Sequence, residues 1–181
     1  MFVSFEGLDG SGKSTQAKLL RGRLEADGEA VLATREPGGT ALGEQIRELV
    51  LHGGHVEPWA EALLYAAARA QHVEQVIRPA LERGEAVVCD RYLDSSVAYQ
   101  GVGRGLGLRR VLDLNLAAVA GLLPDRTFLL LLDPAEVSAG SSSRRKVRSG
   151  KSPSTAARLR SSTRWSPSPR PTPWYATDES T

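Results

Sequence analysis

The stretch Phe2–Ser14, FVSFEGLDGSGKS, decides the fold of this chain. It opens with an apolar run typical of a buried strand, and its second half matches the pattern G-x-x-x-x-G-K-[ST]. The glycines of that pattern let consecutive backbone N–H groups curl around a polyphosphate at the N-terminus of a helix. A helical pattern runs from Gly12 to Ala26. Because strand, loop and helix follow one another as the motif requires, the sequence predicts a nucleotide-binding P-loop.

Beyond this stretch, short apolar runs alternate with longer helical patterns. We predict strands over Phe2–Phe5, Ala30–Ala33, Ala86–Cys89 and Thr127–Leu132, and helices over Gly12–Ala26, Leu42–Leu51, Pro58–Arg83 and Leu108–Leu122. The strands are too apolar to have a wet face, so they belong in a parallel sheet with helices on both faces. In such an α/β fold, ligands bind at the carboxyl ends of the strands.

The predicted helix over Pro58–Arg83 has the clearest periodicity. Pro58 suits its first turn, and Gly84 suits its C-terminal stop. Apolar residues recur within it at spacings of three or four, which predicts one buried stripe. The stripe consists of Leu63, Ala67, Ala70, Val73, Ile77 and Leu81.

Composition limits the setting of the protein. No apolar run approaches the length of a membrane span, so we expect a soluble, cytoplasmic protein without a membrane partner. The single cysteine, Cys89, follows two valines and is predicted to be a buried structural thiol. The histidines have no metal-ligand spacing, and we expect them on the surface: His52, His55 and His72.

Charged and polar residues follow the predicted strands. In AVVCDRY, Asp90 and Arg91 end a buried strand, where a carboxylate can hold Mg²⁺ and an arginine can clamp phosphate oxygens. A plain surface ion pair would explain the two residues equally well without the P-loop in the same chain. On the helix, Tyr65 and Arg69 are four residues apart and share a face, which ordinary packing would also explain.

The motifs FEGLDGSGKST, TREPGGT, LLYAAARAQH and DRYLDSSVAYQG, in this order, resemble thymidylate kinase of the bacterial type. The resemblance covers residues 1 to about 134 and separates the chain from adenylate kinases and GTPases. It implies the P-loop nucleoside monophosphate kinase fold and a homodimer formed through helices on one face. It implies the reaction of ATP with dTMP to give ADP and dTDP, with Mg²⁺ as cofactor, in dTTP synthesis.

The resemblance also implies the roles of individual residues around ATP. The nucleotide would lie on the loop residues Gly7, Leu8, Asp9, Gly10, Ser11, Gly12, Lys13, Ser14 and Thr15. Lys13 would stabilise the transferring phosphoryl group, while Ser14 and Asp90 would organise Mg²⁺. Asp9 would contact the 3′-hydroxyl of the acceptor and, with Lys13 and Arg91, would make up the catalytic set.

A second set of residues is implied around dTMP. Arg35, Arg47 and Arg91 would grip its phosphate, with Glu36 beside them. Tyr65 would stack on thymine, Arg69 and Gln100 would hydrogen-bond its edge, and Ser96 would pack nearby. Tyr99 would sit against the deoxyribose, where a 2′-hydroxyl would clash. Two alternatives stay open: a catalytically impaired nucleotide-binding remnant, and a deoxynucleoside kinase.

The sequence divides into residues 1–136, an incomplete kinase domain of net charge −5, and residues 137–181, a basic Ser, Pro and Arg-rich tail of net charge +7. This tail is expected to be irregular or disordered, and it stands where the family has a catalytic lid and last strand. Three explanations compete: a divergent lid carrying Arg144, Arg145, Lys146 and Arg148, a basic arm for nucleic acid, and a change of reading frame near Val137. We favour the frame change and regard nucleic acid as an improbable partner.

Overall fold

The computed structural model describes residues 1–131 and 159–161. Its centre is a sheet in the order β2-β3-β1-β4-β5. The first four strands are β1 (Phe2–Gly7), β2 (Val31–Arg35), β3 (Ala86–Asp90) and β4 (Arg126–Leu130), and they run parallel to one another. The short β5 (Leu159–Ser161) pairs antiparallel with β4. All four predicted strands are confirmed, and β5 adds one strand from the segment expected to be irregular.

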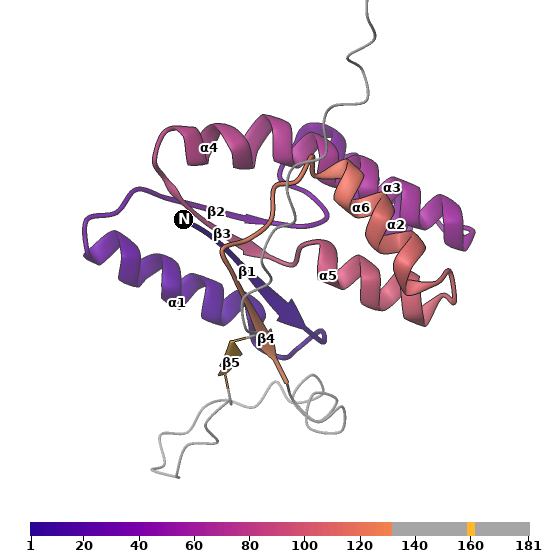
Figure 1. Cartoon of the computed structure of the whole chain (residues 1–181), viewed down its shortest axis with the longest axis horizontal. Coiled ribbons are helices and arrows are strands. Elements are labelled where there is room, and N and C mark those ends of the chain that lie inside the picture. The colour runs from indigo at the N-terminus through magenta and orange to yellow at the C-terminus, as the bar shows by residue number, and fades with distance from the viewer. Residues whose placement is uncertain (132–158, 162–181) are drawn as a thin grey trace, which may run out of the picture.

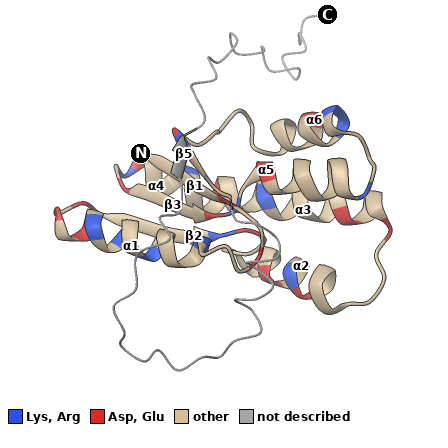
Figure 2. Cartoon of the chain, turned by 90° about the horizontal axis from the view of Figure 1, so that it is seen from below, with Lys and Arg blue, Asp and Glu red and all other residues tan. Residues whose placement is uncertain are grey.

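Helices cover both faces of the sheet (Figure 1). On one face α1 (Lys13–Ala26) covers Val3, Phe5, Val88 and Leu130 through Ala17, Leu20 and Leu24. Its outer surface alternates acidic and basic residues, as Figure 2 shows, and ion pairs such as Arg21–Glu25 lie along it. The amphipathic sequence therefore becomes a surface helix over one half of the core.

The other face carries a long helical rod. It consists of α3 (Pro58–His72), the π-helical η1 (Val73–Ile77) and α4 (Arg78–Glu82), with α2 (Ala41–His52) packed beside α3. This rod, α5 (Leu93–Ser96) and α6 (Leu108–Ala118) cover a core that includes Phe2, Val87, Cys89 and Tyr92. The buried Cys89 thiol predicted from its apolar neighbours is confirmed, and burial raises its pKa well above the ordinary value.

The predicted stripe of the long helix is correct only in its second half. Val73 and Ile77 are fully buried, but Leu63 is 53% exposed and Ala67 is exposed as well. In the first half a largely polar face turns inward instead, with Glu61, Arg69 and His72 buried. The prediction is wrong there because apolar periodicity cannot register a buried face whose polar groups bond to one another.

The helical segment after β3 was not predicted. It is made of α5 and the π-helical η2 (Val97–Gly103), and it carries Ser96, Tyr99 and Gln100. Its serines and glycines are typical of turns, which conceals the helix in the sequence. No helix in residues 1–131 is long and apolar enough to span a membrane. Residues 132–158 and 162–181, which include the basic residues of the proposed lid and the proposed frame change, lie outside the described part of the chain.

Candidate active site

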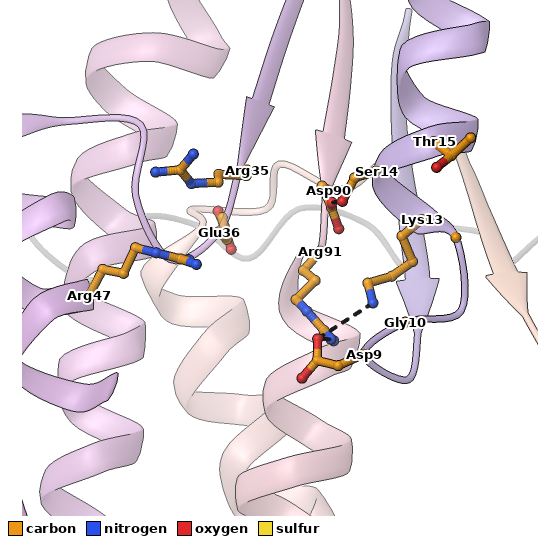
Figure 3. A pocket seen from close by; sticks show the side chains of 11 residues that line it. Asp9, Gly10, Lys13, Ser14, Thr15, Arg35, Glu36, Arg47, Asp90 and Arg91 are labelled. Carbon is orange, nitrogen blue, oxygen red and sulfur yellow. Dashed lines mark hydrogen bonds and ion pairs between the residues drawn. The ribbon is translucent and has the colours of Figure 1, made fainter. Parts of the chain in front are cut away.

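Two adjoining cavities of about 530 Å³ each lie at the carboxyl ends of β1, β2 and β3. The phosphate-side cavity is lined by Asp9, Gly10, Gly12, Lys13, Ser14, Thr15, Arg35, Glu36, Arg47, Asp90 and Arg91 (Figure 3). The base-side cavity extends between α2, α3 and η2 and includes Tyr65, Arg69, Ser96, Tyr99 and Gln100 in its lining. Asp9, Glu36, Arg47 and Arg91 line both cavities, so they mark the junction.

The loop between β1 and α1 has the backbone of a phosphate cradle. Gly10 and Gly12 take φ values of +80° and +92°, which other residues rarely adopt, and Gly12 caps α1 without a side-chain bond. At Gly7 a Cβ would lie 2.7 Å from the Leu130 carbonyl oxygen. The Ser11 hydroxyl is buried and has no hydrogen-bond partner among the described residues. An orphaned donor and an uncapped helix N-terminus fit a bound anion.

Lys13 is folded back onto this loop. Its ammonium donates to the Leu8 carbonyl oxygen at 2.7 Å and lies 3.8 Å from an oxygen of Asp9. Burial and the nearby Arg91 charge lower the pKa of Lys13. A phosphate oxygen would offer this cation a stronger partner than a neutral carbonyl.

Arg91 reaches the P-loop from the end of β3. Its Nη2 donates to Asp9 at 2.5 Å, its Nη1 donates to Ser95 at 3.0 Å, and its guanidinium lies 5.4 Å from the Tyr99 ring centroid. Partial burial alone would raise the pKa of Asp9, but the hydrogen bond and charge of Arg91 hold it below its usual range. The φ of Arg91 is +71°, a strained value for a residue other than glycine.

Ser14 and Asp90 meet beside the cradle, as Figure 3 shows. The Ser14 hydroxyl donates to an oxygen of Asp90 at 2.5 Å, although the two residues are 76 positions apart. A hydroxyl and a carboxylate beside a polyphosphate are oxygen donors suited to Mg²⁺, which commonly takes one or two protein ligands and otherwise keeps water and phosphate. Among residues 1–131 and 159–161, no group of three His, Cys, Asp or Glu side chains could hold a metal ion.

The arginines after β2 are held by the turn that follows. Both oxygens of Glu44 accept from Arg35 Nη2, at 3.1 and 3.3 Å, and one of them accepts from the Gly39 amide at 3.0 Å. The Gly39 amide and Arg35 lower the pKa of Glu44. From α2, Arg47 donates to the Pro37 carbonyl oxygen at 3.0 Å. The turn and α2 thereby bring both guanidinium groups to the phosphate-side cavity.

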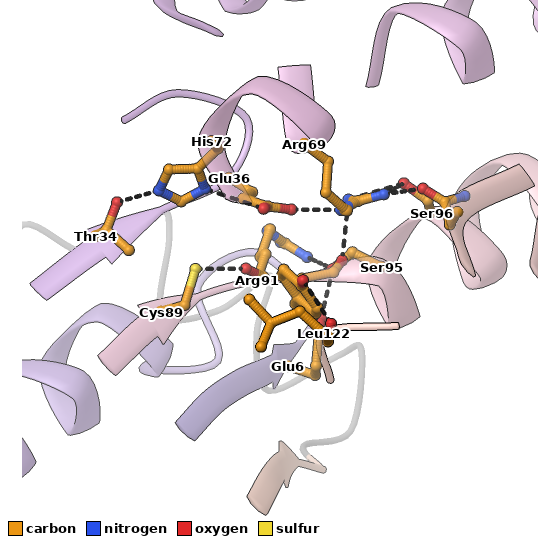
Figure 4. Close-up of polar contacts among 12 residues, drawn as sticks. Glu6, Thr34, Glu36, Arg69, His72, Cys89, Arg91, Ser95, Ser96 and Leu122 are labelled. Carbon is orange, nitrogen blue, oxygen red and sulfur yellow. Dashed lines mark hydrogen bonds and ion pairs between the residues drawn. The ribbon is translucent and has the colours of Figure 1, made fainter. Parts of the chain in front are cut away.

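Beneath the junction lies a buried network around Glu36 (Figure 4). One oxygen of Glu36 accepts from Arg69 Nε at 2.6 Å, and the other is 3.0 Å from His72 Nδ1. The other nitrogen of His72 is 2.7 Å from the Thr34 hydroxyl. The prediction of surface histidines holds for His52 and His55, which are exposed, but is wrong for His72, whose exposed fraction is zero.

The remaining nitrogens of Arg69 are also engaged. Both Nη atoms donate to the Ser96 hydroxyl at 3.2 Å, Nη2 donates to the Tyr92 carbonyl oxygen at 3.2 Å, and Nη1 donates to Asn115. Arg69 lines the base-side cavity but is 3% exposed. It therefore braces α3, α5 and α6 in this structure, whatever it offers to a ligand.

Glu6, at the end of β1, organises the turn after β3. Its buried carboxyl group accepts from the Tyr92 amide at 2.7 Å and from the Ser95 hydroxyl at 2.5 Å. Burial raises the pKa of Glu6 to about 7, against the opposing effect of these two hydrogen bonds. Sequence reasoning missed this residue, although its position immediately before the P-loop glycine is a usable signal.

The structure thus places most of the predicted site residues on two connected cavities. Gly7, Leu8 and Ser11 line neither cavity: Gly7 and Ser11 shape the loop from beneath, and Leu8 is 41% exposed. Functional candidates that the sequence did not reveal are Glu6, Glu44, Glu61, His72, Ser95, Arg104 and Asn115. His72 could have been found, because it continues the helical face of Tyr65 and Arg69.

Comparison with known proteins places this site in a family. A family model described as "Thymidylate kinase" matches residues 5–158. Thymidylate kinases of Bifidobacterium longum (strain DJO10A) and Clavibacter sepedonicus are 61% and 63% identical over 140 and 136 residues, 75% of this chain in each case. The chain spans 68% and 64% of the lengths of these two relatives.

A solved structure agrees with the sequence comparison. The crystal structure of thymidylate kinase from Ehrlichia chaffeensis matches with a TM-score of 0.70 and 39% identity, over 77% of this chain and 81% of that one. The fold, the joined cavities and the family model are mutually consistent. The chain belongs to the thymidylate kinase family.

Proposed function

We propose that the chain transfers the γ-phosphoryl group of ATP to dTMP, giving ADP and dTDP. The observation that carries the proposal is the junction of the two cavities, where Asp9, Arg47 and Arg91 face both. One cavity has a phosphate cradle, and the other has an aromatic and polar lining that suits a nucleoside. Charged groups at their meeting point are what a transfer between two phosphates requires.

On the donor side, the P-loop amides and Lys13 would hold the β- and γ-phosphates of ATP. The Lys13 ammonium would exchange the Leu8 carbonyl oxygen for phosphate oxygens, which are charged acceptors. Ser14 and Asp90 would hold Mg²⁺, whose charge offsets that of the phosphates when it is bound. The uncapped N-terminus of α1 adds a favourable dipole at the same place.

On the acceptor side, Arg35, Arg47 and Arg91 would hold the phosphate of dTMP. Arg47 is held by one neutral carbonyl oxygen, and Arg91 by the exposed Asp9, so both can turn to a dianion at little cost. Glu36 would stay beneath them, because its two oxygens are already committed to Arg69 and His72. We assign Asp9, released from Arg91, to the 3′-hydroxyl of the acceptor.

In the base-side cavity, Tyr65 would stack on thymine and Tyr99 would face the deoxyribose. Both rings line the cavity, and burial raises the pKa of Tyr65, so its hydroxyl stays protonated at neutral pH. Gln100 would hydrogen-bond the base edge. Ser96 and Arg69 would form the floor of the cavity, where they already bond to each other.

The transfer itself would be a direct in-line displacement. The dTMP phosphate oxygen attacks the γ-phosphorus, the bond to the β-phosphate oxygen breaks, and the electron pair leaves with ADP. Lys13 and Arg91 would neutralise charge on the equatorial and bridging oxygens as that bond breaks. No covalent enzyme intermediate is required.

A coupled assay of ADP release with ATP, Mg²⁺ and dTMP tests this function. We expect release that depends on dTMP, and no release with thymidine, which a deoxynucleoside kinase would prefer. Calorimetry with dTMP alone separates binding from transfer. Binding of dTMP without ADP release would identify the chain as the nucleotide-binding remnant and contradict the proposed activity.

We also propose that the chain acts as a homodimer in the cytoplasm. The support is a set of exposed leucines on neighbouring α2 and α3: Leu42, Leu49 and Leu63 are 43%, 47% and 53% exposed. Such side chains favour burial against a second copy. Light scattering after size exclusion tests this, and a monomer at micromolar concentration would contradict it.

A further inference from the structure

The far end of the base-side cavity holds a polar cluster of three residues. Glu61, in the first turn of α3, accepts at Oε1 from Gln100 Nε2 at 2.7 Å and at Oε2 from Arg104 Nη2 at 2.7 Å. Glu61 and Gln100 are 8% and 5% exposed, and all three line the cavity. Within residues 1–131 and 159–161, the Gln100 side-chain oxygen has no hydrogen-bond partner, and it is not among the fully buried atoms.

We propose that Glu61 is a positioning residue that locks the orientation of the Gln100 amide and thereby selects bases with an N3–H group over cytosine. The inference rests on the proposed function, because it concerns how the base of a pyrimidine monophosphate is read. It adds a residue to that function that touches Gln100 rather than the substrate.

The lock follows from the chemistry of a carboxylate. An ionised carboxylate only accepts hydrogen bonds, whereas a primary amide donates at its nitrogen and accepts at its oxygen. The Gln100 amide must therefore turn its nitrogen toward Glu61, and an amide rotated by 180° would set two acceptors against each other. The ion pair with Arg104 holds Glu61 at its other oxygen, which leaves Oε1 for Gln100.

The locked amide presents a fixed pattern to the cavity. One N–H points to Glu61, so the carbonyl oxygen and the second N–H form the pair that a base can meet. Thymine and uracil match this pair with N3–H and an adjacent carbonyl oxygen. Cytosine, in the same pose, brings an unprotonated N3 to the carbonyl oxygen and an amino group to the N–H. Both contacts are then repulsive, and rotating the amide to relieve them would break its bond to Glu61.

Substitution of Glu61 by glutamine tests the lock. Glutamine has the same shape but can accept or donate, so it tolerates both orientations of Gln100. We expect the ratio of the Kd of dCMP to that of dTMP, measured by calorimetry, to fall about tenfold or more in Glu61→Gln. A change of charge alone would not move this ratio, since both nucleotides carry the same phosphate.

Glu57→Gln is the matched control. Glu57 precedes the same helix, is exposed and contacts His55 rather than the cavity, so its ratio should equal that of the wild type. Thermal unfolding of each variant checks folding. In the wild-type chain alone, dUMP should bind much more tightly than dCMP, since it shares the N3–H edge of thymine without the methyl group.

Three results would count against the inference. An unchanged ratio in a folded Glu61→Gln variant would overturn it and leave the proposed function intact. Wild-type binding of dCMP within about threefold of dUMP would overturn it without any variant. A wild-type chain that binds neither dTMP nor dUMP would overturn the proposed function, and the inference with it.

Discussion

The phosphate-side and base-side cavities share a wall but are built differently. The first depends on glycine backbone and on charged side chains with replaceable partners: Lys13 bonds to a neutral carbonyl oxygen, and the Asp9 side chain is 93% exposed. The second is lined by side chains that are tied to one another, with Arg69 and Gln100 almost fully buried. The contrast is between groups that await a charged ligand and groups already fixed.

This difference predicts where substitutions act. On the phosphate side the intramolecular partners are weak, so removing a cation should affect turnover much more than folding. On the base side each polar group satisfies another buried group, so removing one leaves its partner without a hydrogen bond. Changes there should appear first in stability and in the choice of base. The experiments below set the two behaviours against each other.

The largest effect is expected from Lys13→Ala. Loss of the ammonium removes charge stabilisation during phosphoryl transfer, and we expect kcat to fall about 10³-fold or more in the coupled ADP assay. The unfolding free energy should change much less, since only the bond to the Leu8 carbonyl oxygen is lost. Lys18→Ala, at an exposed position of the same helix, is the control and should leave kcat unchanged. Equal rates for the two variants would remove Lys13 from the mechanism.

Arg69→Met tests the opposite behaviour. Methionine fills part of the space but leaves the Glu36 carboxylate, the Ser96 hydroxyl and the Tyr92 carbonyl oxygen without their donor. Breaking such a buried pair from one side should cost about 3 to 5 kcal/mol of unfolding free energy in urea.

The control for this variant is Arg21→Met on the surface of α1. Arg21 pairs with Glu25 at 2.7 Å, a distance close to that of the buried pair, but both partners are about half exposed. Its loss should cost under about 1 kcal/mol. Comparable costs for the two variants would mean that the base-side network is not the fixed structure described above.

The phosphate side was largely predictable from sequence. The glycine spacing of the P-loop requires one backbone shape, and residues at the carboxyl ends of parallel strands must meet at one edge of the sheet. This is why Ser14 and Asp90 could be paired across 76 positions. Arg91 followed from the same reasoning, although its left-handed backbone did not, because no local pattern encodes strain in a residue other than glycine.

The base side was predictable only in part. Tyr65 and Arg69 were placed on one helical face, but His72 and Glu61 extend that same face and were not recognised. Their burial depends on partners from other elements, Glu36 after β2 and Gln100 in η2, which helical periodicity cannot reveal. The apolar stripe through Leu63 failed for the same reason, since the satisfied polar face is the buried one.

Glu6 lies between the two cavities in behaviour, because it is buried like the base-side groups but braces the strand end that carries Arg91. Its pKa, raised from 4.5 to about 7, means that the folded chain holds a proton here that the unfolded chain releases. Stability from this group is therefore present below pH 4.5 and is lost as the pH rises to about 7. By linkage the loss amounts to roughly 3 kcal/mol.

Glu6→Gln should remove this pH dependence. Glutamine can still accept from the Tyr92 amide and can donate to the Ser95 hydroxyl, but it does not titrate. Urea unfolding at intervals between pH 4.5 and 8 should show the variant gaining on the wild type as the pH rises. Glu25→Gln, at an exposed carboxyl group on α1, should not show this gain. Parallel curves for Glu6→Gln and the wild type would mean that Glu6 is ionised throughout.

The smallest effect separates the two hydrogen bonds of His72. Glu36 only accepts, so His72 Nδ1 donates to it, and in the neutral ring Nε2 accepts from the Thr34 hydroxyl. Asparagine places an amide near the Nδ1 position, and glutamine places one near the Nε2 position. His72→Asn should thus keep the bond to Glu36, and His72→Gln should keep the bond to Thr34.

Hydrogen bonds to charged groups contribute more than neutral ones, about 1.5–3 against 0.5–1.5 kcal/mol, so His72→Gln should unfold more easily than His72→Asn by about 1 kcal/mol. The difference is read from urea unfolding of the two variants under identical conditions. If His72→Asn were the less stable variant, the contact with Thr34 would outweigh the contact with Glu36. The buried carboxylate would then depend on Arg69 alone, and the fixed network of the base side would end at that arginine.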